Sequence, residues 1–568
     1  MSKFIVYDFE VFRHDFLVVF KQLGKTHEVF VNDYEGIKNY FNAHQKDIFV
    51  GYNNRHYDDF ILKGVLSDLN PYKISEWIIE KGKNGWQFPG LNKIYFNSLD
   101  LMQDISGAIG ISLKEIESNL GLNIEESEVD FNIDRHLTPE EIAKTIGYCK
   151  HDVDCTEKLM EVRSDYIKAK LMLIKEFNLP MSCIGKTNAQ LTAEVMNPRK
   201  KEYDDDDCYY FPDNLEIENK DIFELYQSPL DKTKHLIVDL CGVPHKLAFG
   251  GLHGATEKAH YHESDGEILN ADVTSYYPSM IIKYGFFCRG IRDPKLYEKI
   301  YNQRLAWKKA GDPRQAAFKL VLNTFFGAMG SSYNRLYDPL QCNQICITGQ
   351  LFLIDLIEKL TPHITLIQSN TDGICFQTKN RKVCEEIIHD WEKRTGMEME
   401  IDNIKQIYQK DVNNYIIEMA NGKIKTKGSY VKNYKKGSFA SNSMTILDDA
   451  IVKYFVYNTP VEETINECND PIKFQITAKK GPTFKRVEWE VDGKMQVTNN
   501  VNRIFASPNN RYGQVFKIKQ NGNKNLIGGL PEHCLIFNKD LKELDINLID
   551  KSWYIKEALK RINDFKGA

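Results

Sequence analysis

The sequence predicts an α/β protein built from several domains, and three observations lead to this fold class. Two apolar segments near the amino terminus, KFIVYDFEVF and DFLVVFKQL, alternate like paired strands, and IFVGYN near residue 50 is typical of a third strand. A helix of capping-box type begins at Thr138, with Pro139 at its first position and Glu141 three residues after the cap. The 568 residues correspond to three or four domains at roughly 150 residues each.

Proline, glycine and short turns mark the ends of the later elements. Asp293-Pro294 begins a helix that Gly311 ends, and Asp312-Pro313 begins a second one, so a helical hairpin is expected. The run ITLIQ, the turn SNTDG and the run ICFQ predict a β-hairpin with Asp372 at its tip. Residues 166–260 are less periodic, and we interpret them as a connector that leads into the next domain.

Composition is typical of an ordinary intracellular globular protein. The chain has 42% hydrophobic and 27% charged residues, and no apolar run approaches the ~18 residues of a membrane span, so no membrane is expected as a partner. Asp8 and Glu10 interrupt the amino terminus where a signal peptide would be apolar. The 12 cysteines show no CxxC pair, which favours reduced thiols in a cytoplasm.

Charge is distributed unevenly along the chain. A net charge of −5 counts against a uniformly basic nucleic-acid binder. The region from Asn421 to Lys436 nevertheless holds six lysines, no acid and two tyrosines. This basic strip is typical either of a nucleic-acid contact or of a solvated, lysine-rich hairpin.

A first set of acids lies in the amino-terminal region. Asp8 and Glu10 are two residues apart on a predicted strand, so both side chains point to the same face and can share a metal ion. Asp58 ends the segment NRHYD after the third strand, and Tyr148 and Asp152 lie one turn apart in a helical stretch. Phosphodiester hydrolysis uses such a set, because cations neutralise the attacking and departing oxygens while a further group orients the water.

These residues resemble the three exonuclease motifs of the DEDD superfamily in its tyrosine subtype. The resemblance implies a ribonuclease H-like 3′→5′ exonuclease domain over residues 1–165. Asp59 is adjacent to the last acid of NRHYD, and the tyrosine of that motif fixes the alignment on Asp58. By this resemblance the metal carboxylates are Asp8, Glu10, Asp58 and Asp152, and Tyr148 orients the nucleophilic water.

Three later segments resemble the motifs of family B DNA polymerases and occur in the same order. DVTSYYPS at 272–279 resembles motif A, with Tyr276 where leucine is common. KLVLNTFFG at 319–327 resembles motif B, because its lysine, asparagine and second phenylalanine share one helix face. NTDG at 370–373 resembles motif C, with Asn370 in place of the usual first aspartate.

The resemblance implies two Mg²⁺ or Mn²⁺ ions per active site, bridged here by Asp272 and Asp372. A lysine on the motif B helix suits the triphosphate of a dNTP. Tyr277 would stack under the sugar and exclude a 2′-hydroxyl. The predicted nucleotide-binding residues are Lys319, Asn323, Arg304, Lys308, Tyr277, Ser275 and Phe326.

Two less specific segments resemble DNA contacts of the same family. FGGLHG at 249–254 resembles a glycine-rich loop whose bare backbone approaches template phosphates, although it could also be a flexible turn. KTKG at 425–428 resembles the lysine motif that grips the primer. The predicted DNA-binding residues are Lys425, Lys427, Tyr430, Gly250 and Gly251.

The function predicted by this resemblance is template-directed DNA synthesis with proofreading, on primed and single-stranded DNA. The short spacing from Asp272 to Lys319 resembles that of phage or mobile-element replicases. We further expect a monomer in the cytoplasm, that of the host cell if the chain is phage-encoded, with phage replication accessory proteins as partners. The expected architecture is a right hand with a ferredoxin-like palm. Its predicted domains are exonuclease 1–165, connector and start of palm 166–260, palm 261–285, fingers 286–330, palm 331–430 and thumb 431–568.

An alternative is a stand-alone exonuclease whose polymerase domain is catalytically weakened and serves as a DNA-binding scaffold. Asn370 motivates this alternative, because motif C loses one charge there. ATP hydrolysis is not indicated, since Gly185-Lys186-Thr187 lacks the first glycine of a phosphate-binding loop and has Pro180 in its place.

Overall fold

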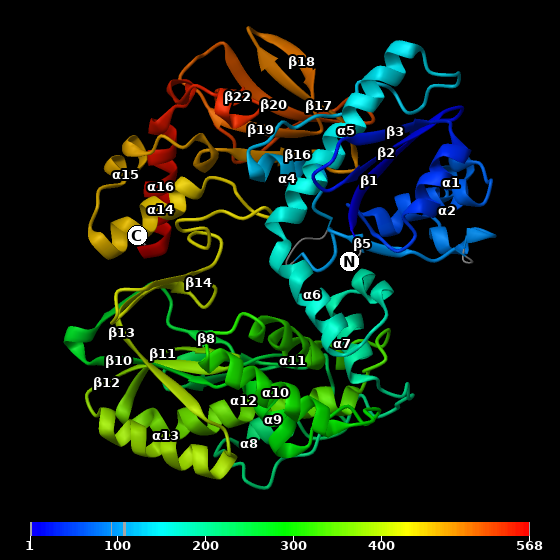
Figure 1. Ribbon diagram of the computed structural model, residues 1–568. Helices are drawn as coiled ribbons and strands as arrows, with labels where there is room; N and C mark the ends of the chain where they lie inside the picture. The colour runs from blue at the N-terminus through cyan, green and yellow to red at the C-terminus, as the bar shows by residue number, and fades with distance from the viewer. Residues whose placement is uncertain (1–2, 92–93, 106–109, 567–568) are drawn as a thin grey trace. The chain divides into compact units, whose positions relative to one another are not determined.

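The computed structural model of the chain describes residues 3–91, 94–105 and 110–566 (Figure 1). Contacts between residues divide the chain into two units, each assembled from three separate segments. The first unit comprises Met1–Thr187, Lys435–Ile446 and Asn466–Tyr554, and the second comprises Asn188–Tyr434, Leu447–Ile465 and Ile555–Ala568. The prediction of a mixed α/β protein with several sheets is confirmed.

The first unit contains a mixed sheet with the strand order β3-β2-β1-β4-β5. Strand β1 pairs antiparallel with β2 and parallel with β4, and β4 pairs parallel with β5. The segment predicted as the third strand is β4, and the preceding β3 was missed because its short sequence, HEVFV, does not alternate between apolar and polar residues. The strands are β1 (Phe4–Val11), β2 (Phe16–Gln22), β3 (His27–Val31), β4 (Ile48–Gly51) and β5 (Asn97–Asp100).

The two faces of β1 have different neighbours. Ile5, Tyr7 and Phe9 join a hydrophobic core with α1 (Tyr34–Ala43), α2 (Asp58–Leu66) and α3 (Pro71–Ile79). The long helix α5 (Pro139–Val162) packs beside β1 and β2 (Figure 1), and its capping box at Thr138 is confirmed. Because side chains alternate along a strand, the even-numbered residues of β1 cannot join that core.

Two smaller sheets complete the first unit, with strand orders β16-β19-β22 and β18-β17-β20-β21. Helix α4 (Leu113–Leu120) packs against β16 and β19, and α6 (Ser164–Glu176) follows α5. Most residues of these sheets come from the region predicted as a thumb. The strands are β16 (Ile476–Lys479), β17 (Phe484–Val491), β18 (Lys494–Thr498), β19 (Val501–Ala506), β20 (Tyr512–Lys519), β21 (Lys524–Leu526) and β22 (Cys534–Ile536).

The second unit is built on a large sheet with the order β15-β14-β13-β10-β12-β11-β8-β7-β6, in which β9 also pairs with β13. Strands β11 and β12 form the predicted hairpin around Asp372. The strands are β6 (Leu236–Leu240), β7 (Val243–Leu247), β8 (Gly254–Ala255), β9 (Ala259–His262), β10 (Glu267–Val273), β11 (Ile364–Asn370), β12 (Gly373–Thr378), β13 (Met399–Asp411), β14 (Asn414–Met419) and β15 (Ile424–Lys427).

Helices α10 and α11 of the second unit form the predicted helical hairpin. Asp293 caps α10, and Gly311 adopts a positive φ of 68° just after its end, a conformation that glycine adopts without strain. Helix α11 begins at Gln315, two residues later than expected, because Pro313 and Arg314 form a turn. The helices are α7 (Asn188–Met196), α8 (Lys220–Leu225), α9 (Tyr276–Tyr284), α10 (Pro294–Lys309), α11 (Gln315–Met329), α12 (Pro339–Leu360) and α13 (Arg381–Thr395).

Three further helices complete the described chain: α14 (Thr445–Tyr457), α15 (Val461–Glu467) and α16 (Lys551–Lys566). The segment Pro339–His363 is long and apolar enough to cross a membrane by composition, which the sequence analysis had not found. Most of its apolar stretch is buried inside the protein, which is typical of a core helix. No disulfide is present among the described residues.

One buried cation ties α4 to the small sheets of the first unit. Arg503 on β19 is fully buried and donates hydrogen bonds to Gln475 Oε1 at 2.9 Å and to the carbonyl oxygens of Leu122 at 2.8 Å and Ser118 at 3.2 Å. The guanidinium therefore satisfies carbonyl groups at the carboxyl end of α4, where the helix dipole favours a positive charge.

Replacing Arg503 is expected to destabilise the first unit strongly. Arg503→Ala should lower the free energy of unfolding by about 3 kcal/mol or more, because several buried carbonyl groups lose their donor. Urea denaturation followed by circular dichroism measures the change. Arg511→Ala is the matched control, since Arg511 pairs with Asp492 at the surface and should change stability by less than about 1 kcal/mol. Equal losses in the two variants would contradict the role of Arg503.

Candidate active sites

The predicted exonuclease residues meet on the α5 side of β1. Asp8 and Glu10 share this face of the strand, and the thiol of Cys149 on α5 lies 3.7 Å from Asp8 Oδ2. Asp58, the first residue of α2, accepts a hydrogen bond from the backbone N–H of Phe9 at 3.2 Å. Asp152 on α5 completes the group and, like Glu10 and Asp58, is less than 10% exposed.

Burial and mutual repulsion disfavour ionisation of this carboxylate cluster, defined as Asp8, Glu10, Asp58 and Asp152. Burial, followed by the charge of Asp152, raises the pKa of Asp8 to about 8. Burial raises the pKa of Asp152 to about 6, against the opposing effect of Lys114. The pKa values of Glu10 and Asp58 are also raised, first by burial and then by Asp8. A divalent cation, which prefers carboxylate oxygens, would relieve this repulsion.

Asp58 and the adjacent Asp59 have different surroundings, which supports the alignment on Asp58. Asp59 Oδ1 accepts hydrogen bonds from the Tyr7 hydroxyl at 2.5 Å, Asn54 Nδ2 at 2.9 Å and the Ser98 hydroxyl at 2.9 Å. These donors occupy Asp59 inside the core. Asp58 instead interacts electrostatically with Asp8 in the carboxylate cluster.

Lys114 is a neighbour of this cluster that sequence reasoning missed. It lies in the first turn of α4, forms ion pairs with Asp152 and with Glu117 at 3.0 Å, and places its ammonium 4.6 Å from the ring centroid of Tyr148. Burial, followed by Asp152, raises the pKa of Tyr148, so its hydroxyl remains a hydrogen-bond donor at neutral pH. The only sequence signal nearby is the capping box of Ser112 and Glu115.

In the second unit, strand pairing brings Asp272 and Asp372 together. Asp272 on β10 pairs with Gly373 on β12, and the backbone N–H of Val273 donates to the carbonyl oxygen of Asp372 at 2.7 Å. Burial, followed by the charge of Asp372, raises the pKa of Asp272 to about 6. A Cβ atom at Gly373 would lie 2.1 Å from Asp272 Oδ1, so a glycine is required beside this carboxylate.

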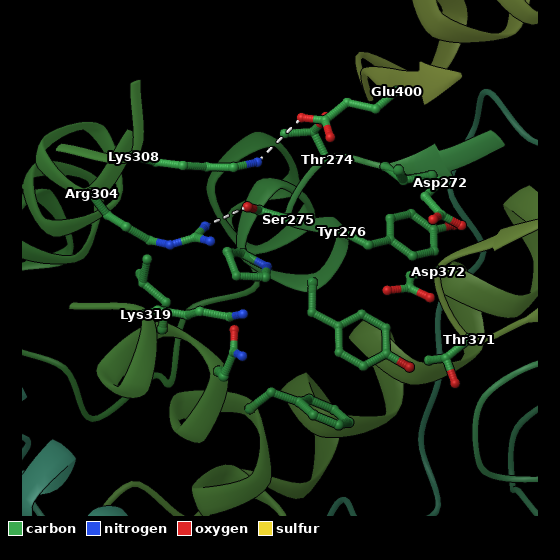
Figure 2. Close-up of a pocket in the computed structure, with 16 residues that line it drawn as sticks. Asp272, Thr274, Ser275, Tyr276, Arg304, Lys308, Lys319, Thr371, Asp372 and Glu400 are labelled. Carbon is green, nitrogen blue, oxygen red and sulfur yellow. Dashed lines mark hydrogen bonds and ion pairs between the residues drawn. The ribbon is translucent and has the colours of Figure 1, made fainter. Parts of the chain in front are cut away.

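A cavity of about 370 Å³ adjoins both carboxylates and carries cationic side chains at its other end (Figure 2). The guanidinium of Arg304 donates to the hydroxyl of Ser275 at 2.7 Å, and Lys308 lies 3.4 Å from Glu400. The Nε–H of Arg304 is buried and has no hydrogen-bond partner among the described residues. All of the predicted nucleotide-binding residues line this cavity: Lys319, Asn323, Arg304, Lys308, Tyr277, Ser275 and Phe326.

Aromatic side chains shape the floor of this cavity. The rings of Tyr277 and Phe326 have centroids 4.6 Å apart, and they connect α9 to α11. Tyr276 is 4% exposed and donates its hydroxyl proton to the carbonyl oxygen of Gly349 on α12 at 2.8 Å. Tyr276 therefore anchors α9 to the core. Sequence reasoning missed Glu400, Thr274 and Thr371, which also line the cavity.

A second cavity, of about 400 Å³, is lined by the same two aspartates together with Lys425 and Lys427. Lys425 lies 3.4 Å from Asp402 on β13. A Cβ atom at Gly251 would lie 2.3 Å from Thr371 Oγ1, so the glycine-rich loop runs directly beside the Asp372 turn.

Two predicted DNA contacts lie elsewhere. Tyr430 does not line this cavity, because its hydroxyl donates to Asp564 at 2.5 Å and its ring packs near Phe565 on α16. Gly250 accepts a hydrogen bond from the thiol of Cys346 at 3.0 Å. Asn370, the last residue of β11, lines the second cavity, and its buried Oδ1 has no hydrogen-bond partner in the described chain.

Comparisons with known proteins give a likeness in structure at low sequence identity. No protein-family model matches the sequence, and no curated protein matches it. The structure is similar to that of the family B DNA polymerase from the hyperthermophilic archaeon Pyrobaculum calidifontis. The match covers 100% of this chain and 78% of that chain, with 13% sequence identity and a TM-score of 0.41.

The metal-free protein is expected to lose stability as the pH rises from about 4 to 8. Folding raises the pKa of Asp8 from 3.8 to about 8 and that of Asp152 to about 6, so the folded state binds more protons than the unfolded chain in this range. The free energy of unfolding therefore falls as these acids ionise. A divalent cation that replaces the protons should raise the melting temperature more at pH 8 than at pH 6, as calorimetry with EDTA and with Mn²⁺ would measure.

The double variant Asp8→Asn, Glu10→Gln is the control for this prediction. It removes two of the crowded acids with little change in side-chain volume, so both the loss of stability with pH and the effect of Mn²⁺ should become smaller. The same Mn²⁺ effect in the wild type and in this variant would exclude a cation site at the carboxylate cluster.

Proposed function

We propose that the chain is a template-directed DNA polymerase with a 3′→5′ proofreading exonuclease. The observation that carries the proposal is the cavity that has Asp272 and Asp372 at one end and Arg304 and Lys319 at the other. Nucleotidyl transfer needs carboxylates and cationic side chains in one cavity. The carboxylates hold the metal ions, and the cationic side chains hold the triphosphate. The sequence motifs at 272–279, 319–327 and 370–373 support the same function, since their side chains line this one cavity.

The carboxylates fit Mg²⁺ or Mn²⁺. Asp272 and Asp372 would hold the ions of the polymerase site, and burial beside Asp372 gives Asp272 a raised pKa that a cation would lower. The carboxylate cluster of the first unit would hold those of the exonuclease site. When bound, two such ions neutralise the attacking and departing oxygens of an in-line displacement at phosphorus.

The other residues of the cavity have separate roles in this proposal. Lys319 and Arg304 bind the triphosphate, and the buried Nε–H of Arg304 is a donor available to an anion. Lys308 assists them, although its ion pair with Glu400 must open or be shared. Tyr277, in contact with Phe326, supports the sugar and excludes a 2′-hydroxyl. Asn323 and Ser275 complete the nucleotide site.

The second cavity is proposed to hold the primer terminus. It adjoins the same two aspartates, and Lys425 and Lys427 can contact backbone phosphates there without reading sequence. The glycine-rich loop at Gly250 and Gly251, which runs beside Thr371, is proposed to contact template phosphates. Tyr430 has no assigned DNA contact in this proposal, because its hydroxyl is engaged by Asp564.

For the exonuclease, Tyr148 is proposed to orient the water that attacks the phosphodiester. Its hydroxyl remains protonated near neutral pH and lies on α5 one turn from Asp152. A ribonuclease H-like exonuclease fold and a right-hand polymerase of family B with a ferredoxin-like palm are part of the same proposal. So is a phage or mobile-element origin, with action in the host cytoplasm alongside replication accessory proteins.

A second candidate function is a stand-alone exonuclease whose second unit only binds DNA. The specific observation in its favour is Asn370, which removes a charge from the metal site and leaves a buried oxygen without a partner in the described chain. Incorporation of labelled dNTP on a primed template, with Mg²⁺ or Mn²⁺, separates the two functions.

The two activities are expected to be separable by mutation. Asp272→Ala or Asp372→Ala should reduce primer extension at least about 1,000-fold, because loss of a metal carboxylate removes several kcal/mol of charge stabilisation. Primer degradation should remain. The double variant Asp8→Ala, Glu10→Ala should do the reverse. Gel assays of a labelled primer with and without dNTPs measure both, and a folded variant that loses both activities would refute separate sites.

Lys319→Ala is expected to raise the apparent KM for dNTP by about 10-fold or more, since a hydrogen bond to a charged group contributes about 1.5–3 kcal/mol. Steady-state single-nucleotide incorporation measures the change. Lys309→Ala is the control, because Lys309 is an exposed lysine on α10 that does not line the cavity. An unchanged KM in Lys319→Ala would exclude a triphosphate contact.

A further inference from the structure

We propose that Glu117, His151 and Cys155 form a binding site for a borderline-soft divalent cation such as Zn²⁺, separate from the carboxylate cluster. Glu117 belongs to α4 and is fully buried. His151 and Cys155 lie one turn apart on α5, so both side chains leave the helix on the same face. The proposal does not depend on the polymerase or exonuclease activity.

The distances between the ligand atoms fit a tetrahedral ion. His151 Nε2 lies 3.4 Å from Cys155 Sγ and 3.6 Å from Glu117 Oε1, and the three ligand atoms all lie within 4.8 Å of one another. Zn²⁺ binds nitrogen and oxygen at about 2.0–2.1 Å and sulfur at about 2.3 Å, which places tetrahedral ligands about 3.3–3.6 Å apart. An ion could therefore enter with small side-chain movements.

A second, independent observation comes from Glu117. Its Oε2 is buried and has no hydrogen-bond partner among the described residues, although a buried carboxylate oxygen without a partner is costly. Oε1 is already 3.0 Å from the ammonium of Lys114. A metal ion held by the Glu117 carboxylate would supply the positive charge that this unpartnered oxygen lacks.

The histidine is oriented as a metal ligand usually is. Its other ring nitrogen, Nδ1, lies 3.7 Å from Oε1 of Glu125. This distance is longer than a hydrogen bond, but metal-bound histidines typically direct their second ring nitrogen to a carboxylate, and a small movement of Glu125 would make that bond. Glu125 is therefore proposed as a positioning residue.

The donor set favours Zn²⁺ over the Mg²⁺ expected at the carboxylate cluster. A thiol and an imidazole are poor ligands for Mg²⁺, which prefers oxygen, whereas both bind Zn²⁺ well. Binding would release the thiol proton of Cys155 to solvent and form a bond between the metal and the thiolate. Because Lys114 contacts both Glu117 and Asp152, the ion would also fix the position of one exonuclease carboxylate.

The test uses Co²⁺ as a spectroscopic probe on the full chain after removal of metals with a chelator. One equivalent of Co²⁺ should produce a cobalt–thiolate charge-transfer band that one equivalent of Zn²⁺ abolishes. Cys155→Ser should eliminate the band and weaken Zn²⁺ binding at least about 100-fold, and Glu125→Gln should weaken it about 10-fold. Elemental analysis after dialysis should give one zinc per wild-type chain.

Matched controls separate this site from the carboxylate cluster. Cys149 is the other α5 thiol that lies beside acids, so Cys149→Ser and the double variant Asp8→Ala, Glu10→Ala should both keep the band. If Cys155→Ser does not fold, as judged by circular dichroism, His151→Gln serves in its place and should weaken Zn²⁺ binding to a similar extent. A wild type without the band, a band that survives Cys155→Ser, or a band lost in Cys149→Ser would each overturn the proposal.

Discussion

Repulsion between buried carboxylates is the constraint on which both candidate sites depend. In the first unit, Asp8 and Glu10 would separate if they were free to move, but the opposite face of β1 is fixed by Tyr7 and Phe9 in the hydrophobic core. Hydrophobic burial thus holds like charges at close range. A positive charge stabilises such a group of acids, which explains why the ammonium of Lys114 lies beside Asp152.

In the large sheet of the second unit, strand register brings acidic side chains together. The pairing of β10 with β12 places Asp272 opposite Gly373, and the pairing of β10 with β13 places it opposite Glu400. One strand therefore presents a single aspartate to two cavities, one lined by the cations of α10 and α11 and the other by the lysines of β15. A slip of one residue in either pairing would turn the carboxylate to the other face of the sheet.

Local patterns in the sequence predicted the elements that carry the sites, because strand alternation, capping boxes and turn residues act over a few positions. The β1 pair, the α5 cap, the α10–α11 hairpin and the Asp372 turn were all predictable in this way. Long-range packing was not. Nothing near Lys114 signals that it meets Asp152, and nothing near Tyr430 signals that it packs on α16. The short strand β3 was missed because its sequence does not alternate between apolar and polar residues.

The grouping of distant segments in the first unit limits how the protein can be divided. Arg503 donates hydrogen bonds to carbonyl groups at the carboxyl end of α4. A fragment that stops at residue 165 would therefore expose these carbonyl groups and the surface of α4 that packs against β16 and β19. Truncation of the gene between the amino-terminal acid motifs and the motif at 272–279 should therefore give an insoluble product. Expression of the first unit as an isolated, folded domain would require its three segments to be joined, in a circularly permuted or split form.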